Sequence, residues 1–343
     1  PYLTLLGNAS AGDQELLFDQ QVPSDWQEGD RLVLTGTKGQ INWDDKSLSH
    51  DDNSFFEDEV LIITGIDGNR VTFQHNDTNS NALRFDHSTP DGYNLEIYVA
   101  NLTRNIRFET EAGENAALME RGHLMFMDQD VNFHNAGMYN LGRTNKDVIL
   151  NDVVLNDDGS LKAGTGKNRR GRYPIHFHKT LTKEGAYDQV AAKVTGSAVV
   201  GSPGWGYTLH SSKATLEDNV SFDVLGTHYV TEDGDEIATF RRNIAIKSVG
   251  ASTHKGTNLQ ILDDFRGAKR DVGVLGFGFW FDSPYSVHNF EENIVTSTKD
   301  TAFLFYGHND KEFAEAKRDD QLKTPTSGLV DIPISRLPVN LQH

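Results

Sequence analysis

Two histidines in the segment GRYPIHFHK, residues 171–179, have the spacing of a metal site. Successive side chains of a β-strand point to opposite faces, so we expect Ile175 and Phe177 to point into a core. His176 and His178 would then share the outer face. Two imidazoles that project the same way from one strand can bind a single ion. Two solvent-facing histidines with only structural hydrogen bonds are the alternative.

Further candidate ligands follow at intervals that suit neighbouring strands. In the segment GYTLH, Leu209 would point inward and His210 outward. In the segment HYVTED, Val230 would point inward, and Thr231 and Asp233 outward. Adjacent strands lie about 4.8 Å apart, so side chains on one wall can meet. We therefore expect one outer wall to gather His176, His178, His210 and Asp233.

This cluster could do metal-assisted chemistry. We predict a divalent metal ion, zinc-like or calcium, bound by His176, His178 and His210. Glu232 and Asp233 could ligate or accept a proton, but adjacent strand residues face opposite ways and make a poor pair for two-carboxylate hydrolysis. Arg172 could neutralise a substrate carboxylate, and His123 lies one or two repeats upstream. The catalytic candidates are Arg172, Asp233, Glu232 and His123.

Basic residues gather beside these histidines although the chain has a formal net charge of −18. Guanidinium groups pair bidentately with carboxylates or sulfates, so this segment suits an anionic ligand. A basic loop that balances acidic neighbours is the alternative. Aromatic rings could stack on sugars or pack in the core. The candidates for substrate binding are Arg169, Arg170, Lys179, Trp205 and Tyr229.

The elements that must position these residues recur with a period. A polar residue, then Asn or Asp, then Val or Ile occurs with spacings of 25 from Asn105 to Asp130, 24 from Asn219 to Asn243 and 50 from Asn243 to Asn293. Three short strands in each period of about two dozen residues are typical of a right-handed parallel β-helix. Gly and Asn suit its corners, and stacked asparagines can hydrogen-bond along its axis. A β-sandwich or another all-β fold is the alternative.

The period divides the chain into two regions. Residues 1–98 lack it but contain runs typical of strands, so we predict a β-rich N-terminal cap or partial domain. Residues 99–343 are predicted to form the β-helix domain. A polar, glycine-rich loop near 145–170 would interrupt the coils, and such loops often carry function.

Composition excludes several classes of protein. The 343 residues contain no cysteine, which removes disulfides, zinc-thiolate sites and cysteine nucleophiles. The acidic balance argues against nucleic acid as a partner. The longest apolar run, residues 272–281, is too short to span a membrane. Since the chain starts at Pro1 rather than Met, we expect a processed or excised product. We expect it to be a monomer or part of a larger chain.

The segment at 171–178 resembles a signature of large extracellular proteins in which an eight-glycine domain precedes parallel β-helix repeats. That family includes hyaluronan-binding and hyaluronan-depolymerising proteins and bacterial secreted relatives. The resemblance implies a secreted protein that binds or cleaves an extracellular polysaccharide. Supporting segments follow in family order at Trp26–Asp30, Leu102–Ile106, Arg121–Met127, Leu141–Thr144, Gly201–Gly206 and Glu232–Glu236.

Two functions remain open at this point. The chain could cleave an anionic, uronic-acid-containing polysaccharide by metal-assisted elimination or hydrolysis, which would explain clustered titratable groups. It could instead be a non-catalytic glycan-binding or adhesin module of a larger extracellular protein. Neither function involves nucleic acid or a membrane span.

Overall fold

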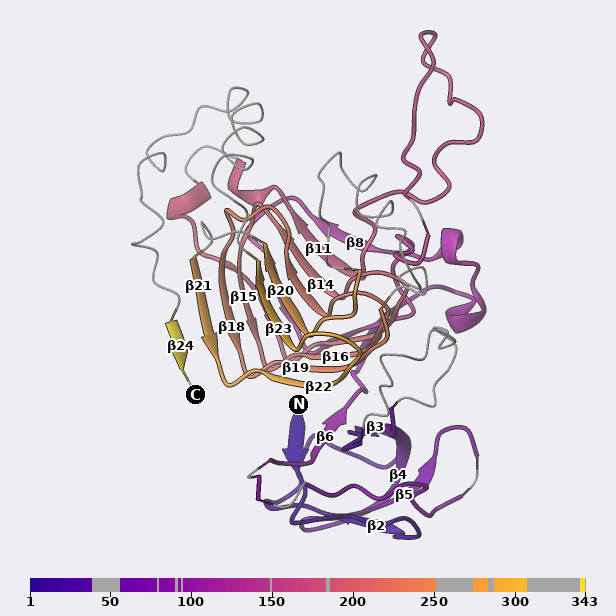
Figure 1. Ribbon diagram of the computed structural model, residues 1–343, viewed down its shortest axis with the longest axis vertical. Coiled ribbons are helices and arrows are strands. Elements are labelled where there is room, and N and C mark those ends of the chain that lie inside the picture. The colour runs from indigo at the N-terminus through magenta and orange to yellow at the C-terminus, as the bar shows by residue number, and fades with distance from the viewer. Residues whose placement is uncertain are drawn as a thin grey trace.

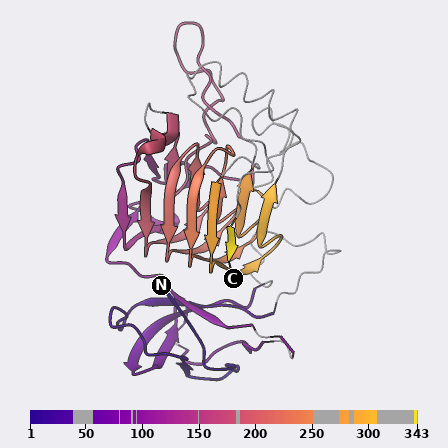
Figure 2. The same ribbon diagram turned by 90° about the vertical axis from the view of Figure 1, so that its left-hand side faces the viewer.

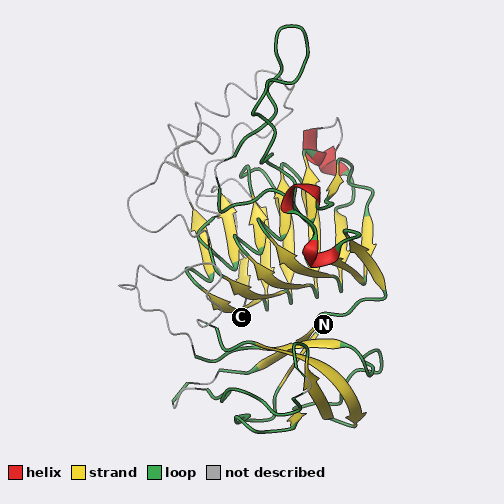
Figure 3. Cartoon of the chain, turned by 90° about the vertical axis from the view of Figure 1, so that its right-hand side faces the viewer, coloured by secondary structure: helices red, strands yellow, loops and turns green. Residues whose placement is uncertain are grey.

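The computed structural model describes residues 1–38, 56–78, 80–89, 92–93, 95–148, 150–182, 186–250, 274–282, 287–306 and 340–342. Within these ranges the regular structure is β-strand, apart from short 3-10 helices. None of the helices described is long and apolar enough to cross a membrane. The 3-10 helices are η2 (Gly113–Asn115), η3 (Leu118–Glu120), η4 (Thr180–Thr182) and η5 (Ala186–Asp188) (Figure 3).

The larger domain is a parallel β-helix, which confirms the predicted fold class (Figure 1). Each coil contributes one strand to each of three parallel sheets. The packing sheet contains β7 (Ile106–Glu109), β10 (Ala136–Tyr139), β13 (Ala198–Ser202), β16 (Val220–Val224), β19 (Ile244–Ser248) and β22 (Ile294–Thr298). The site sheet contains β8 (Leu124–Phe126), β11 (Ile175–His178), β14 (Tyr207–His210), β17 (Tyr229–Thr231), β20 (Phe279–Asp282) and β23 (Phe303–Tyr306). The third sheet contains β9 (Asn132–His134), β12 (Ala192–Thr195), β15 (Lys213–Glu217), β18 (Ile237–Arg241), β21 (Val287–Glu291) and β24 (Asn340–Gln342).

Apolar side chains fill the inside of the coils and stack from one coil to the next. Tyr207 and Tyr229 stack with ring centroids 4.9 Å apart, and Tyr229 stacks on Phe279 at 4.5 Å. Ile175 and Phe177 belong to the same buried core, as the alternation predicted. Every second residue of the site sheet therefore anchors its strand, which leaves the residues between them to face outward.

A ladder of asparagines runs along one corner of the helix, with Asn219 and Asn243 buried and Asn293 partly buried. The side-chain amide of Asn219 donates to Oδ1 of Asn243, and that of Asn243 donates to Oδ1 of Asn293, both at 2.9 Å. The predicted stacking is thus confirmed for these copies. Asp130 is an exception, because it precedes β9 of the third sheet, whereas the strand register places Ser197 and Ala136 at the ladder position in the preceding coils. The pattern at Asp130 therefore belongs to a different corner.

The N-terminal domain is one antiparallel-paired sheet in the order β1-β6-β3-β4-β5-β2. Because β6 completes this sheet, the domain extends a few residues past the predicted boundary at 98. Its strands are β1 (Tyr2–Thr4), β2 (Glu15–Leu17), β3 (Arg31–Leu34), β4 (Glu59–Asp67), β5 (Arg70–His75) and β6 (Tyr98–Asn101).

This domain packs against the side of the coil. Val33, Ala100 and Leu102 join a buried cluster with outward residues of the packing sheet, such as Phe222 and Ile246. Figure 2 shows the domain beneath the row of parallel strands. The packing sheet is therefore covered, and the site sheet faces away from this contact.

The segment between β10 and β11 leaves the coil and returns, as predicted for a loop near 145–170 (Figure 1). Antiparallel bridges join Asn151 to Asn168 and Leu155 to Leu161. At its base the buried Asn168 side chain donates to the carbonyls of Asn145 and Val148 at 2.9 and 3.1 Å. The base of the loop is therefore fixed beside the N-terminal end of β11.

Candidate metal centre

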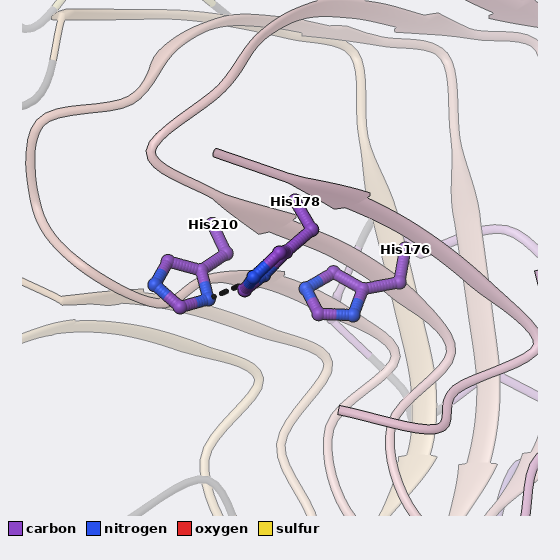
Figure 4. Close-up of side chains that lie close together, drawn as sticks. All are labelled: His176, His178 and His210. Carbon is purple, nitrogen blue, oxygen red and sulfur yellow. Dashed lines mark hydrogen bonds between the residues drawn. The ribbon is translucent and has the colours of Figure 1, made fainter. Parts of the chain in front are cut away.

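Three histidines from two adjacent strands of the site sheet come together on its outer face. His178 of β11 lies directly beside His210 of β14 in the strand register. His176 precedes His178 by two residues and so projects from the same face. One ring nitrogen from each of His176, His178 and His210 lies within 4.8 Å of the others (Figure 4). The predicted histidine cluster therefore forms.

Hydrogen bonds fix which nitrogen of two rings faces the centre. Nδ1 of His176 donates to the carbonyl of Gly171 at 2.9 Å, so Nε2 carries the lone pair. Nε2 of His210 lies 2.8 Å from Oδ2 of Asp233, which leaves Nδ1 as an acceptor. Metal-bound histidines almost always donate their second N–H to a carbonyl or carboxylate in this way.

The inward nitrogens are arranged as metal ligands are. Nδ1 of His178 lies 3.1 Å from Nδ1 of His210, so without an ion a single proton must lie between them. Within the part of the chain that is described, Nε2 of His176 is buried and has no hydrogen-bond partner. A buried polar atom without a partner is costly unless something binds to it. A cation would satisfy all three nitrogens.

Glu232 is the carboxylate that completes this cluster. Its Oε2 lies 3.4 Å from Nδ1 of His210 and 4.0 Å from Nε2 of His176. The sequence placed Val230 inward and Thr231 outward, and that orientation is wrong, although Asp233 does reach the cluster, at Nε2 of His210. Leu209 pairs with Thr231, so Thr231 points inward, and the next residue, Glu232, lies beside His210.

The corner that carries Glu232 and Asp233 is tied down by a second carboxylate. The buried Glu236 accepts backbone N–H bonds of 2.7 to 3.1 Å from Ser211, Glu232, Asp233 and Gly234. Burial, and then the nearby carboxylates of Asp235 and Asp233, raise the pKa of Glu236 to about 8. Asp233 also accepts a bond of 2.8 Å from the Ser211 hydroxyl. Asp233 is therefore positioned to orient His210.

Burial keeps the histidines in the form that binds metal. Desolvation lowers the pKa of His176 to about 4. The pKa of His178 is also lowered to about 4, first by burial and then by the neighbouring His210. Metal ions bind neutral imidazole, so both rings are competent at neutral pH.

His123 and Arg172 are not among the residues that form the histidine cluster itself. Burial lowers the pKa of His123 to about 4, and the charges of Arg143 and Arg172 add to that shift. Arg143 and Arg169 line a cavity of about 170 Å³ together with Met119 and Gly166. Sequence reasoning singled out Arg169 and Arg172 but missed Arg143, although Arg143 lies in one of the segments that carry the family resemblance, Leu141–Thr144.

The two aromatic residues predicted to bind substrate are buried, which is a correction. Trp205 is 0% exposed and stacks on Tyr173 at 4.7 Å, with the Lys146 ammonium 3.5 Å from its ring centre. Tyr229 is also 0% exposed and lies in the aromatic stack inside the coil. Neither ring can stack on a bound sugar, because packing already covers its faces.

The remaining basic candidates have different environments. Arg170 is paired with Asp152 of the long loop, which also accepts the Arg170 backbone N–H at 2.8 Å. Lys179 is exposed and has a left-handed backbone angle, φ 54°, directly after His178. Arg169 is half-buried at the cavity near Gly166. Of these, Arg169 is therefore the one that borders a cavity.

Comparison with known proteins shows which proteins this chain resembles. Residues 161–329 match the family model described as CEMIP beta-helix. A G8 domain-containing protein of Dictyostelium discoideum is 27% identical over 234 residues, covering 68% of this chain and 16% of that protein. The predicted resemblance is confirmed: the chain is a β-helix protein that is similar to the G8 domain-containing proteins.

One of the relatives has a name that states an activity. The human cell surface hyaluronidase CEMIP2 is 30% identical over 173 residues, covering 49% of this chain and 11% of that protein. This chain thus spans less than a fifth of the length of the curated relatives it matches. Among solved structures, the tailspike protein gp49 from Pseudomonas phage LKA1 matches 86% of this chain and 46% of its own, with 10% identity and a TM-score of 0.23.

Proposed function

We propose that this chain is the catalytic β-helix of an extracellular enzyme that cleaves an anionic polysaccharide at a metal centre. The observation that carries the proposal is the convergence of three histidine nitrogens within 4.8 Å beside the Glu232 carboxylate. Two of these histidines have their outer N–H groups held by Gly171 and Asp233. A surface that only binds glycan has no need of such an arrangement.

The donor set fits a transition metal better than calcium. Three imidazoles and one carboxylate suit zinc and its neighbours, whereas calcium prefers six or more oxygen ligands. We therefore propose zinc or a similar ion held by His176, His178 and His210, with Glu232 as the carboxylate. Such an ion acts as a Lewis acid on a bound oxygen.

The protein groups around the centre have separable roles. Asp233 and Gly171 orient the rings of His210 and His176. Since Asp233 accepts from both Ser211 and His210, we assign it the role of orienting His210 and not that of one of two opposed carboxylates. Arg172 would hold the acidic group of the sugar. This assignment favours elimination or metal-assisted hydrolysis over a two-carboxylate glycosidase.

The relatives suggest a first substrate and a location. CEMIP2 is named a cell surface hyaluronidase, so hyaluronan, a uronic-acid polymer, is the first polymer to test. We likewise propose that this chain acts outside the cell.

The first experiment measures metal content. We expect one zinc ion per chain after dialysis against zinc and then buffer, measured by elemental analysis. The double variant His176→Ala/His178→Ala should retain almost none. His134→Ala is the matched control, because His134 lies on β9 of the third sheet, away from the site sheet. Equal zinc in the double variant would contradict the metal site.

The second experiment measures cleavage. The zinc-loaded protein is incubated with hyaluronan, and chain ends are assayed by reducing sugar and by the absorbance of unsaturated uronate. Elimination gives both signals, and hydrolysis gives reducing ends alone. His178→Ala should reduce the rate by about 100-fold or more through loss of the ion. No cleavage of any uronic-acid polymer by the zinc-loaded protein would contradict the enzymatic proposal.

A further inference from the structure

Three arginines converge where the long loop returns to the site sheet. Arg143 and Arg169 line the cavity of about 170 Å³, with Met119 and Gly166. Arg172 is close enough to both for their charges to act on it: burial lowers the pKa of Arg172, and Arg143 and Arg169 lower it further. His123 faces the same charges, those of Arg143 and Arg172. A cluster of positive charge therefore surrounds this cavity.

These arginines differ from others in this acidic chain. Across the residues described here, Arg143, Arg169 and Arg172 make no ion pair, although the chain has 50 acidic residues against 32 basic ones. Asp152 acts weakly on Arg172 but is bridged to Arg170. By contrast, ion pairs join Arg70 to Glu15, Arg84 to Asp77, Arg107 to Glu109, Arg241 to Glu217 and Arg242 to Asp218. Gathering like charges without a counter-charge is unfavourable unless a ligand supplies one.

Backbone contacts hold the three residues in place. The hydroxyl of the fully buried Thr144 donates to the carbonyl of Arg169 at 2.7 Å and accepts the N–H of Arg172 at 2.8 Å. The N–H of Arg143 donates to the carbonyl of Arg172 at 2.9 Å. The arginines are thus preorganised from segments about 25 residues apart in sequence. Preorganisation reduces the entropy lost on binding.

Arg172 and His123, on which the charges of the cavity arginines act, also lie beside the wall that carries the histidines. Gly171, next to Arg172, holds Nδ1 of His176. Met125 pairs with His176, and His123 lies two residues before Met125. From strand rise and spacing, the backbones of His123 and His176 are on the order of 8 Å apart. A polymer could therefore occupy both places at once.

We propose that Arg143, Arg169 and Arg172, with His123, form a subsite for an acidic group of the polymer, either a carboxylate or a sulfate ester. Arginine binds both groups bidentately. That the anion belongs to the polymer rests on the proposed function, whereas the pocket's binding of an anion does not. The subsite would select acidic over neutral polysaccharides.

The test measures binding without turnover. Glucuronate and sulfate are titrated separately into the whole chain carrying His176→Ala/His178→Ala, followed by NMR shifts or calorimetry. We expect binding that Arg143→Gln/Arg169→Gln weakens by tenfold or more, and that Arg70→Gln leaves unchanged. Stronger glucuronate binding assigns the subsite to a uronate, and stronger sulfate binding to a sulfate ester. Equal affinity with and without the two arginines would overturn the proposal.

A second experiment measures the binding of whole polymers, with thermal unfolding as a control for misfolding. Hyaluronan, a sulfated uronate polymer and neutral dextran are compared, and the acidic polymers should bind at least tenfold more tightly. Equal binding of dextran would overturn the subsite. Arg143→Gln alone relieves like-charge repulsion, so its Tm should hold or rise, which guards against misfolding. Anion binding without metal or cleavage would contradict only the proposed function, and cleavage unaffected by the arginine changes would contradict only the subsite.

Discussion

The described part of the chain contains two clusters in which histidines meet a carboxylate, and they differ in whether the protein satisfies the hydrogen-bonding groups of the rings. In the N-terminal domain, the buried Glu59 lies 2.9 Å from Nε2 of His87 and 3.2 Å from Nε2 of His75. In the β-helix, Glu232 lies beside His176 and His210, with His178 close by. The residue types are alike, but the arrangements are not.

The N-terminal cluster is closed. Nδ1 of His87 lies 2.9 Å from the carbonyl of Thr35, and Nε2 of His75 lies 2.9 Å from that of Ala82. Glu59 also accepts the backbone N–H groups of Arg84 and Phe85 at 2.9 and 3.1 Å. Both ring nitrogens of His87 and Nε2 of His75 already face an oxygen, so an ion would have to displace hydrogen bonds. This cluster therefore has a structural role, because it joins separate segments of the N-terminal domain.

The β-helix cluster is open at its centre. Two of its histidines use their outer nitrogens on protein oxygens, and the inner nitrogens face one another. The comparison teaches that composition does not separate a structural cluster from a binding one. The direction in which the second nitrogen of each ring points does.

The largest expected effect comes from opening the closed cluster. Glu59→Ala would leave two buried histidines and two backbone N–H groups without their acceptor, and should lower the free energy of unfolding by about 3–5 kcal/mol. Denaturant unfolding measures this. Zinc content should not change, and a zinc loss comparable to that of His178→Ala would show that the two clusters are not separate in function.

Zinc should stabilise the folded protein through the open cluster and not through the closed one. Because the ion binds the folded site, zinc at about 100 times its Kd should add about 2.7 kcal/mol to the free energy of unfolding. Thermal unfolding with and without zinc measures the gain. His178→Ala should abolish it, whereas Glu59→Gln should retain it. An equal gain in His178→Ala would place the ion elsewhere.

A smaller effect follows from releasing one ring of the open cluster. Asp233→Asn removes the carboxylate that accepts from Nε2 of His210, and such outer groups typically change metal affinity by about 10–100-fold. Competition with a fluorescent chelator measures the change in Kd. Ser211→Ala removes a bond to Asp233 without touching a histidine and should weaken binding less. If Ser211→Ala has the larger effect, Asp233 does not act through His210.

The sequence predicted which histidines meet but not which carboxylate joins them. The alternation around His176 and His178 is clear because Ile175 and Phe177 fill the core. Around Val230 it is ambiguous, because the outer face is apolar too: Val230 packs there with Trp205 and Trp280. Whether Val230 or its neighbours point inward, an apolar residue is buried. The sequence therefore could not reject the alternation that placed Thr231 outward.

Unequal coil lengths limited how many of the other contacts at the site could be predicted from the sequence. Ile175 pairs with Tyr207, 32 residues later, whereas Tyr207 pairs with Tyr229, 22 residues later. Arg143 reaches Arg172 only because the long loop between them returns to its start. A periodic pattern predicts the coil and its corners, such as Asn219 and Asn243, but it cannot predict contacts across an insertion of irregular length.

The smallest predicted effect concerns a buried histidine that meets no carboxylate among the residues described, and it sharpens the contrast with both clusters. His228 is fully buried, its Nδ1 lies 2.7 Å from the Ser221 hydroxyl, and burial lowers its pKa to about 3. The unfolded chain, with a histidine pKa of about 6.5, binds the proton first as the pH falls. The contribution of this residue to the free energy of unfolding is therefore complete above pH 6.5 and is lost between about pH 6.5 and 3, by about 1.4 kcal/mol at pH 5.5.

His228→Asn can retain the bond to Ser221 and should flatten the profile of unfolding free energy against pH by that amount. An unchanged acid slope would mean that His228 does not remain neutral in the folded protein, and that burial alone does not separate it from the paired histidines.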